Sequence, residues 1–356
     1  MTAFNESCSG RRYNPGMLER YFATGEKNLH SLYYIAGRVD ARVSDVGSLS
    51  EARLWELNVS LGIEAGGLRG AGHGELPEKP EVSLLDVKRE LAGRVLSDCR
   101  FCDRRCGADR AGGETGWCGV GAVPRVSFDF LHMGEEPELV PSHTIFFSGC
   151  TFACAYCQNW DIAVHALTGR PAGAEELADS LRDGIAQGSR NVNFVGGDPD
   201  PDLPLVLDTL AALGEDGAFL PMVWNSNTYA SEETMSLLDG VADVHLADFR
   251  YGNDECAKEL SEVDGYVGSV TRNLRRAHQD SEVMIRHLVL PGHLDCCTRP
   301  VMEWTAENLP GVYFNLMFQY RPEYRAGLFP GIDRRLTREE MIRATGMANS
   351  FGLSIE

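Results

Sequence analysis

Three closely spaced cysteines stand in the segment FFSGCTFACAYCQNWD, at the spacing C-x3-C-x2-C: Cys150, Cys154 and Cys157. Three thiolates are able to hold three irons of a four-iron cluster, which leaves the fourth iron free to bind a substrate. Zinc is the alternative, but a closed zinc site takes four ligands, and His143 or His165 would have to complete it. The three-thiol spacing therefore favours an iron–sulfur cluster with one open iron.

Four further cysteines lie upstream, in CRFCDRRCGADRAGGETGWC, at the spacing C-x2-C-x3-C-x11-C: Cys99, Cys102, Cys106 and Cys118. Four thiols complete either a tetrathiolate zinc site or an auxiliary iron–sulfur cluster, and the spacing does not decide between them. A structural metal would fix a glycine-rich segment that has few apolar residues to pack. An iron–sulfur cluster would instead relay electrons to the first site.

The remaining cysteines are expected to be buried or incidental rather than catalytic: Cys8, Cys256, Cys296 and Cys297. The neighbours Cys296 and Cys297 stay candidates for a functional role because they follow the predicted strand end PGH.

The composition predicts a globular protein without membrane contact. The chain has 356 residues, 43% of them hydrophobic, and no apolar run long enough to cross a bilayer. Its first residues are polar and lack the apolar centre of a secretory signal, so we expect a cytoplasmic protein. In that reducing compartment, metal or cluster ligation explains eleven cysteines better than disulfides do. The formal net charge of −19 disfavours a nucleic acid as partner unless a local basic face exists.

A strand–helix alternation must position these thiols. Six apolar runs rich in β-forming residues begin with the one directly before Cys150: TIFFSG, VNFVGG, LPMVWNSN, DVHLADF, VMIRHLVLP and VYFNLMF. Segments with helical spacing, such as the one around Leu177 and Leu181, separate most of them. Right-handed crossovers between six parallel strands predict an α/β fold, either an open barrel or a doubly wound sheet. Functional residues gather at the carboxyl ends of such strands, and there stand Cys150, GGDP, NSN, DFR and PGH.

The chain divides into four predicted parts. Residues 1–83 form a helical extension and a glycine-rich linker, EAGGLRGAGHGELPEKPE, with Ser50 as a predicted helix N-cap. Residues 84–140 form the cysteine-rich metal-binding segment. Residues 141–325 form the barrel, and residues 326–356 a C-terminal helical segment.

The three-cysteine motif, with the aromatic Tyr156 before its last cysteine, resembles the signature of the radical S-adenosylmethionine superfamily. A second segment resembles the superfamily's GGEP sequence, whose backbone receives the methionine amino group, although its acid is one methylene shorter: Gly196, Gly197, Asp198 and Pro199. The segments GCTFACAYCQNWDIA, MVWNSN, IRHLVLPGH and QYRPEY resemble the PflX-like branch, relatives of pyruvate formate-lyase activating enzymes. The resemblance covers roughly residues 84 to 356 and implies a partial (β/α)6 TIM-like barrel.

The resemblance also implies roles for single residues. The three cysteines of the first group would hold a 4Fe-4S cluster, whose open iron chelates the amino and carboxylate groups of S-adenosylmethionine, and Tyr156 would contact the adenine side. Asn225 and Asn227 would line the cofactor pocket, where activating enzymes carry TNG. Asp248 and Arg250 resemble residues of their LDLK segment. Arg286 resembles an arginine that faces the methionine carboxylate, which a guanidinium meets with two parallel hydrogen bonds.

The implied activity is that of an oxidoreductase. It would cleave S-adenosylmethionine reductively and use the 5′-deoxyadenosyl radical to abstract hydrogen from a protein, as in glycyl-radical activation. Its electrons would come from a low-potential donor of the ferredoxin or flavodoxin type. The activating enzymes' LPYH segment is here LMFQYRP, which has no histidine, so we expect a substrate that differs from theirs. The residues expected to meet the substrate follow the sixth strand: Gln319, Tyr320, Arg321 and Tyr324.

Two other classes of function remain open in the sequence. The same scaffold would serve radical modification of another peptide, a nucleic acid or a metabolite. A zinc-binding structural adaptor is the non-enzymatic alternative, and it would hold zinc without cleaving S-adenosylmethionine.

Overall fold

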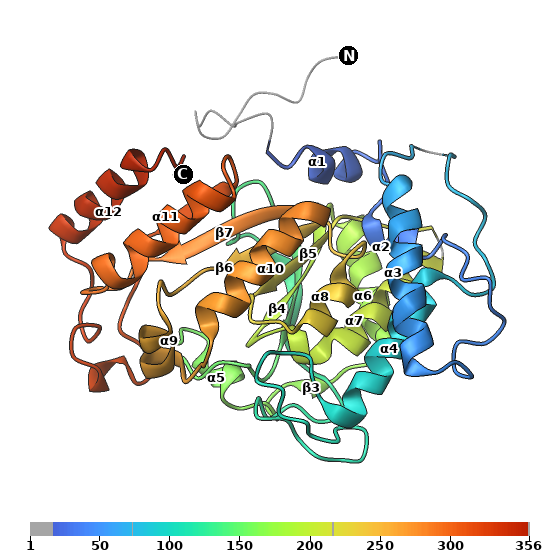
Figure 1. The fold of residues 1–356 in the computed structure, drawn as a ribbon, viewed down its shortest axis with the longest axis horizontal. Coiled ribbons are helices and arrows are strands. Elements are labelled where there is room, and N and C mark those ends of the chain that lie inside the picture. The colour runs from blue at the N-terminus through green and yellow to red at the C-terminus, as the bar shows by residue number, and fades with distance from the viewer. Residues whose placement is uncertain (1–16, 73, 216, 355–356) are drawn as a thin grey trace.

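One sheet of eight strands forms the centre of the molecule, in the order β3-β1-β2-β4-β5-β6-β7-β8 (Figure 1). The computed structural model describes residues 17–72, 74–215 and 217–354. The strands are β1 (Arg125–His132), β2 (Ser142–Phe147), β3 (Arg170–Pro171), β4 (Asn191–Gly196), β5 (Met222–Ser226), β6 (Val244–Asp248), β7 (Glu282–Leu288) and β8 (Tyr313–Met317). The order is open, because β3 and β8 are edges that do not pair with each other.

The six predicted parallel strands are β2, β4, β5, β6, β7 and β8, each paired in parallel with the next. The fold is therefore the α/β class that the sequence predicts, an open sheet consistent with a partial barrel. Two antiparallel strands, β1 and β3, extend the sheet beyond the prediction. The sequence analysis assigned β1 to the cysteine-rich segment and overlooked its alternating apolar residues. A register shift between Val126 and Phe128 leaves Phe128 and Phe130 exposed at the sheet's end.

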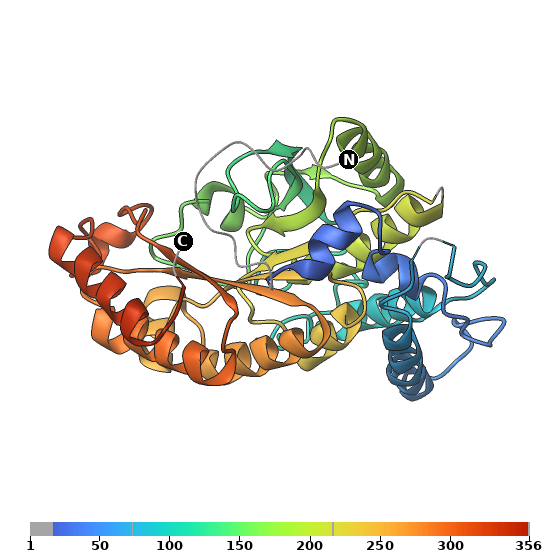
Figure 2. The same ribbon diagram turned by 90° about the horizontal axis from the view of Figure 1, so that it is seen from above.

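Helices cover the outer face of the curved sheet (Figure 2). Those on the outer face include α6 (Ala174–Ala186), α7 (Leu203–Glu215), α8 (Glu232–Leu238), α10 (Tyr266–Asp280) and α11 (Arg299–Asn308). Helices α5 (Trp160–Ala163) and α9 (Asp254–Ser261) lie at one end of the sheet (Figure 1), and α12 (Arg338–Ser350) packs against α11. Leu177 and Leu181, which set the helical spacing in the sequence, are both fully buried on α6. The outer helices thus bury the apolar face that the periodicity predicts.

The N-terminal part adds four helices: α1 (Glu19–Gly25), α2 (Leu32–Ala36), α3 (Glu51–Gly67) and α4 (Leu84–Val95). Ser50 caps α3, as predicted, by accepting a hydrogen bond from the backbone N–H of Arg53 at 3.3 Å. α3 continues to Gly67, so residues 64–67 are helical although the sequence analysis placed them in the linker. Tyr33 and Ile35 of α2 are fully buried in the same core as the barrel helices.

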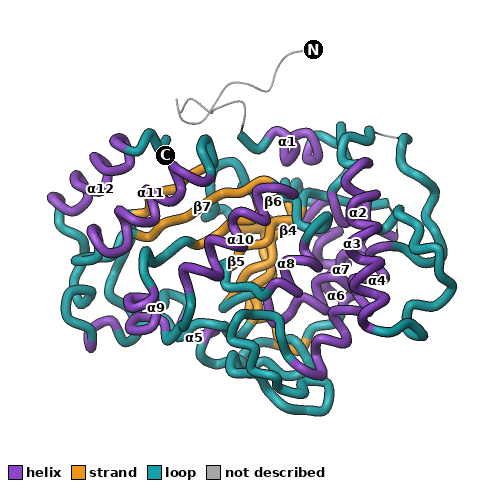
Figure 3. Tube along the Cα trace, in the orientation of Figure 1, coloured by secondary structure: helices purple, strands orange, loops and turns teal. Residues whose placement is uncertain are grey.

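Between α4 and β1, the part of the cysteine-rich segment that carries its four cysteines is loop (Figure 3). Residues 99–124, all of which the structure describes, form turns and bends apart from one isolated bridge between Cys102 and Ala230. No helix among the described residues has the length and hydrophobicity needed for a bilayer span.

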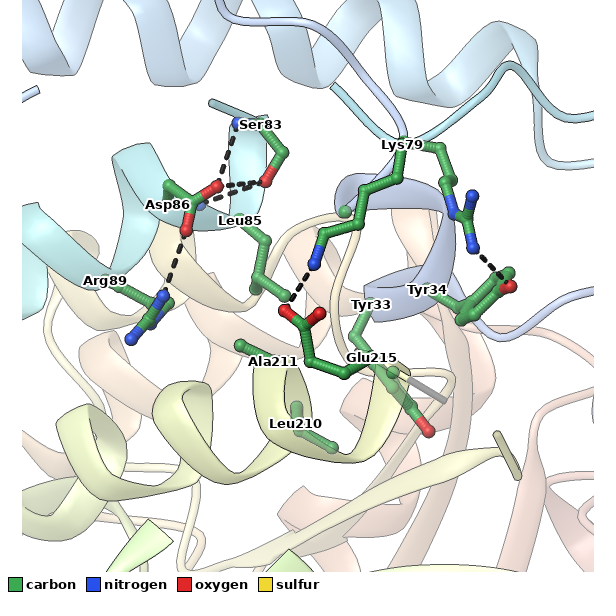
Figure 4. A pocket seen from close by; sticks show the side chains of 13 residues that line it. Tyr33, Tyr34, Lys79, Ser83, Leu85, Asp86, Arg89, Leu210, Ala211 and Glu215 are labelled. Atoms are coloured by element: carbon green, nitrogen blue, oxygen red, sulfur yellow. Dashed lines mark hydrogen bonds and ion pairs between the residues drawn. The ribbon is translucent and has the colours of Figure 1, made fainter. Parts of the chain in front are cut away.

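A cavity lies between three helices, α2, α4 and α7 (Figure 4). Its charged side chains satisfy one another: Asp86 accepts from Arg89 at 2.9 Å, and Lys79 forms an ion pair with Glu215. Because these polar groups are already paired, the cavity serves the packing of the N-terminal part, and we assign it no ligand.

Candidate functional site

The three-cysteine loop begins directly after β2 and is held against the cysteine-rich segment. Gly149 has a φ of 94°, and a Cβ there would lie 2.5 Å from Val120 Cγ2 and 2.9 Å from the carbonyl oxygen of Cys118. Only glycine allows this conformation and this close approach. The turn brings Cys150 into the barrel mouth and places the upstream cysteines beside it.

Nine of the thirteen residues predicted for the cluster and its cofactor line one cavity: Cys150, Cys154, Tyr156, Cys157, Gly196, Gly197, Asp248, Arg250 and Arg286. The cavity measures about 870 Å³ with its open mouth included. It lies at the carboxyl ends of β2, β4, β6 and β7, where the alternation of strands and helices places functional residues.

The cysteine sulfurs in this cavity are surrounded by hydrogen-bond donors. Arg250 Nη1 and Ser261 Oγ each donate to Cys154 Sγ at 3.0 Å, and the backbone N–H of Phe152 donates to Cys150 Sγ at 3.3 Å. Donors of this kind, one of them cationic, favour a thiolate over a thiol. Three thiols that converge on one open cavity with such donors fit a cluster held on three sides.

Burial keeps two of these thiols protonated while no metal is bound. It raises the pKa of Cys150 well above its ordinary value, with a further rise from the nearby carboxyl of Asp198, and it raises the pKa of Cys157 to about 12. Metal binding must therefore release these protons, and the donors around the sulfurs lower the cost of doing so.

One wall of the cavity is a charge network between neighbouring strands. Asp248 and Arg286 are register partners on β6 and β7, so their side chains lie on the same face. Asp248 accepts from Arg286 Nε at 2.9 Å and from Arg250 Nη2 at 2.6 Å. Burial opposes ionisation of Asp248, but the two guanidinium groups hold its pKa below the ordinary value. An ionised Asp248 thus fixes both cations at the cavity wall.

The inner end of Arg286 contacts the loop between β1 and β2. Arg286 Nη2 donates to Asn225 Oδ1 at 2.6 Å, and Nη1 lies 3.4 Å from Glu135 Oε2. Glu136 and Glu138 of the same loop accept from Asn315 and Tyr313 at 2.9 and 3.0 Å. This loop fills the lower part of the barrel, so access to the cavity is from the carboxyl ends of the strands.

The four other predicted residues stand behind the cavity lining: Asp198, Pro199, Asn225 and Asn227. Asp198 accepts from Thr151 Oγ1 at 2.7 Å, and Asn227 Nδ2 donates to the same hydroxyl at 2.7 Å. Burial raises the pKa of Asp198 to about 6. Asp198 and Asn227 therefore support the cysteine loop through Thr151, and Asn225 supports Arg286.

The GGDP segment packs unusually close to the cysteine loop. A Cβ on Gly197 would lie 1.9 Å from the carbonyl oxygen of Gly149, and one on Gly196 would lie 2.3 Å from the backbone of Phe147. Both positions therefore require glycine, and the backbone after β4 forms part of the cavity floor.

Tyr156 lies in the cavity wall rather than at its mouth. Its hydroxyl is 2.7 Å from that of Tyr251, and its ring packs edge-on against Tyr320. The histidines weighed as a fourth ligand do not line the cavity. His143 Nε2 lies 2.7 Å from Asp129 Oδ1 on β1, and His165 packs against the ring of Trp160.

The upstream cysteines converge on a second, smaller cavity, together with Arg104, Trp117 and Thr151: Cys99, Cys102, Cys106 and Cys118. The Arg104 guanidinium lies 3.3 Å from the centre of the Trp117 ring and donates to the carbonyl oxygen of Thr151 at 2.6 Å. Burial raises the pKa of Cys118 to about 12. The four thiols gather as predicted, and a metal among them stays a prediction.

Sequence reasoning missed several residues that the fold brings to the cavity. Ser261 ends α9, 107 positions after the Cys154 that it contacts, and Glu135 lies in a loop assigned to the cysteine-rich segment. Neither has a spacing that would mark it. Only the pairing of β6 with β7 and the return of α9 bring them into place. Cys8 lies outside the described residues.

Comparisons with known proteins agree with this geometry. The sequence model of the Radical SAM superfamily matches residues 144–305. An uncharacterized protein of Methanocaldococcus jannaschii is 40% identical over 347 residues, which cover 95% of this chain and 98% of that protein.

Two solved structures are similar at low scores. A domain of a pyruvate-formate lyase-activating enzyme from Bacteroides vulgatus has a TM-score of 0.38 at 18% identity and covers 47% of this chain and 97% of its own. Streptococcus suis SuiB bound to S-adenosylmethionine has a TM-score of 0.43 at 13% identity and covers 58% of this chain and 47% of its own.

Proposed function

Because this chain belongs to the radical SAM superfamily, we propose that it cleaves S-adenosylmethionine reductively at a 4Fe-4S cluster held by Cys150, Cys154 and Cys157. The supporting observation is that the three thiols share one cavity with two guanidinium groups and the backbone of a double glycine. When bound, the cluster supplies the electron that breaks the sulfonium carbon–sulfur bond and yields a 5′-deoxyadenosyl radical.

The chain's own residues bind and orient in this proposal. Arg250 and Ser261 stabilise the negative charge on the Cys154 sulfur through hydrogen bonds of 3.0 Å. Asp248 holds the guanidinium of Arg286 at the wall, where it meets the methionine carboxylate. The backbone of Gly197 would receive the amino group and Tyr156 would border the adenine side, and both residues line the cavity. The filled lower barrel keeps water from entering at that end.

We further propose that the substrate is a protein, as in glycyl-radical activation. Apolar side chains are exposed beside the cavity mouth: Trp160 is 39%, Val164 47% and Tyr324 39% exposed. The Trp160 and Tyr324 rings stack with centroids 5.7 Å apart, and Val164 also lines the cavity. An apolar rim of this kind suits contact with a macromolecule more than with a small polar metabolite.

Not all residues expected to meet the substrate lie on that rim. Gln319 is exposed, but Tyr320 is buried and donates to the carbonyl oxygen of Ile332 at 2.5 Å. Arg321 pairs with Glu323 at 3.0 Å. The proposal therefore places substrate contact on Tyr324 and Gln319. It also includes a cytoplasmic location and an electron donor of the ferredoxin or flavodoxin type.

Replacing Cys154 with Ala tests the cluster assignment. We expect anaerobically purified Cys154→Ala protein to lose the cluster's visible absorbance, its reduced paramagnetic signal and the cleavage of S-adenosylmethionine, because three thiolates are the smallest set that holds the cluster. Cys8→Ala, a thiol outside both predicted cysteine groups, is the control and should keep all three. Retention of the absorbance and the signal in Cys154→Ala would overturn the assignment, and a zinc adaptor would show neither in the wild type.

A further inference from the structure

A third group of metal-ligating side chains, the Cys3His cluster, lies apart from both predicted cysteine groups: Cys256, His293, Cys296 and Cys297. One ligand atom from each lies within 4.8 Å of all the others, and the described residues contain no other group of three or more so closely gathered. Cys256 is in the first turn of α9, after β6, and the other three follow β7. The fold therefore assembles the cluster from two crossover connections.

Three distances within the cluster match the edges of a tetrahedral zinc site, and Cys297 Sγ lies within 4.8 Å of the other three ligand atoms. Zn–S bonds of about 2.3 Å and a Zn–N bond of about 2.0 Å place two sulfurs about 3.8 Å apart and a sulfur and a nitrogen about 3.5 Å apart. Cys256 Sγ lies 3.8 Å from Cys296 Sγ. His293 Nδ1 lies 3.5 Å from Cys256 Sγ and 3.4 Å from Cys296 Sγ. These thiols are close enough to share one metal ion, whereas cysteines of a cubane bind separate irons and stand farther apart.

Backbone contacts hold the ligands in place without a metal. Asn253 Nδ2 donates to the carbonyl oxygen of Cys296 at 2.7 Å, and the backbone N–H of Cys297 donates to the carbonyl oxygen of His293 at 2.9 Å. A Cβ on Gly252 would lie 2.8 Å from the carbonyl oxygens of both Cys296 and Cys297, so the loop before α9 packs directly on the ligand turn. Residues 294–298 form a single π-helical turn, a form that is rare and often marks function.

Hydrogen bonds between these side chains do not explain why the four residues lie together. A thiol is a weak donor and a weak acceptor, so three of them around one imidazole add little stability. The three cysteines are free thiols, and thiols and imidazoles are the side chains that zinc prefers in structural sites.

We propose that the Cys3His cluster binds one zinc ion as a closed, four-coordinate structural site. Three thiols and one imidazole complete the tetrahedron, which leaves no position for a substrate. Zinc binding releases the thiol protons and ties the start of α9 to the turn after β7.

The site reaches the three-cysteine loop through α9. The far end of this helix accepts two backbone hydrogen bonds from that loop, from Ala153 to Ser261 at 3.1 Å and from Ala155 to Leu260 at 2.7 Å. Ser261 Oγ also donates to Cys154 Sγ. A zinc ion at one end of α9 would therefore steady the residues that support the proposed cluster at the other.

Metal analysis of the full chain tests the proposal. We expect Cys296→Ser to contain about one zinc fewer per chain than the wild type, with the iron content unchanged. The matched control is Cys118→Ser, which removes a thiol of the upstream group and should keep the zinc of the Cys3His cluster. Because the upstream group is a second place for zinc, the double variant should lose the sum of the two single losses. Equal zinc in Cys296→Ser and the wild type, or iron in place of this zinc, would overturn the proposal.

Thiol alkylation of the wild type gives a second test, which does not depend on whether a variant folds. Peptide mass spectrometry follows the rate at which Cys256 and Cys296 are alkylated, with and without a zinc chelator. We expect both thiols to react slowly until the chelator removes the metal, with zinc release measured in the same sample. If Cys296, which is only half-buried, reacts equally fast with and without the chelator, the site holds no metal.

Discussion

Lys88 shows how one buried charge affects stability. It is one of four lysines in the chain, and its side chain is 1% exposed, with Nζ donating to the carbonyl oxygen of Ser236 at 3.0 Å. Burial lowers its pKa to about 8. The unfolded chain, where the lysine pKa is about 10.4, therefore binds more protons above pH 8 than the folded chain does. The buried charge lowers the free energy of unfolding at neutral pH. This loss is relieved as the pH rises above the pKa that Lys88 has in the folded chain.

We predict that Lys88→Met removes this pH dependence. Between about pH 8 and about pH 10.4, the free energy of unfolding of the wild type should rise by about 3 kcal/mol relative to Lys88→Met. Denaturant titrations of both proteins across this range measure the difference, in which the other titrating groups cancel. Lys258→Met is the control, because Lys258 is largely exposed, and its difference from the wild type should stay flat. A flat difference for Lys88→Met as well would show that Lys88 is not desolvated.

Motif residues were the part of the site that the sequence revealed. The three cysteines, Arg250 and Arg286 stand at strand ends in a recognisable pattern, and the fold places all of them on one cavity. Ser261 gave no such signal, because a serine near a helix end is common, and His293, although it ends the strand-end segment PGH, gave no sign of its partner. Their meaning depends on partners 107 and 37 positions away, at Cys154 and Cys256.

At the scale of elements, α1 and α2 are fastened to the amino-terminal end of the sheet through Asp243. This carboxylate is fully buried and accepts from the backbone N–H groups of Leu32 at 3.0 Å and Met222 at 2.8 Å, and it forms an ion pair with Arg20. Replacing it would leave a cation and two backbone donors without their acceptor.

We therefore predict that Asp243→Ala lowers the free energy of unfolding by about 3 kcal/mol, the lower end of the cost of breaking a buried ion pair. Arg42→Ala is the matched control, because Arg42 and Glu64 form an ion pair with side chains that are 61% and 42% exposed. Its effect should stay below about 1 kcal/mol. Thermal and denaturant unfolding measure both. Equal effects of the two substitutions would mean that α1 and α2 contribute nothing to global stability.

The elements that the sequence predicted are those with buried apolar faces. The six parallel strands are covered on the outside by helices, so each reads as a continuous apolar run. β1 was missed although its apolar residues alternate, and two of them, Phe128 and Phe130, are exposed beyond a register shift. The helical start of the linker was missed because glycines at 66 and 67 suggested a loop, although Ala65 is buried against the core.

At the scale of the whole molecule, the two ends of the sheet differ in kind. Figure 1 shows α1 at one end and α5 and α9 at the other. The end beside α1 is closed by apolar packing, in which Leu18 and Tyr21 contact Val223 and Met284 from inside the sheet. The opposite end carries all three cysteine groups, two of them on loops and the third on the start of α9 and the turn after β7. Bound metals would cross-link and stabilise these segments.

The open, apolar rim predicts how the enzyme depends on its partner. If the substrate is a folded protein, exposed Trp160 packs against it, and Trp160→Ala should reduce partner-stimulated production of 5′-deoxyadenosine several-fold while the slow unstimulated cleavage stays unchanged. The reason is that Trp160 contacts Tyr324 and His165 outside the cavity lining. Ile342→Ala is the control, because Ile342 is an apolar residue on α12 that is even more exposed than Trp160.

The measurement is made with reduced enzyme and a soluble lysate from its own anaerobic cells, before and after protease treatment. Intact lysate should stimulate wild-type and Ile342→Ala enzyme alike, and a protein of the lysate should gain a backbone radical or a covalent change. Protease should abolish the stimulation, because a digested partner no longer presents a folded surface to the rim. Stimulation that survives protease, and that Trp160→Ala leaves intact, would instead identify a metabolite as the substrate and leave the exposed Trp160–Tyr324 pair without a role in turnover.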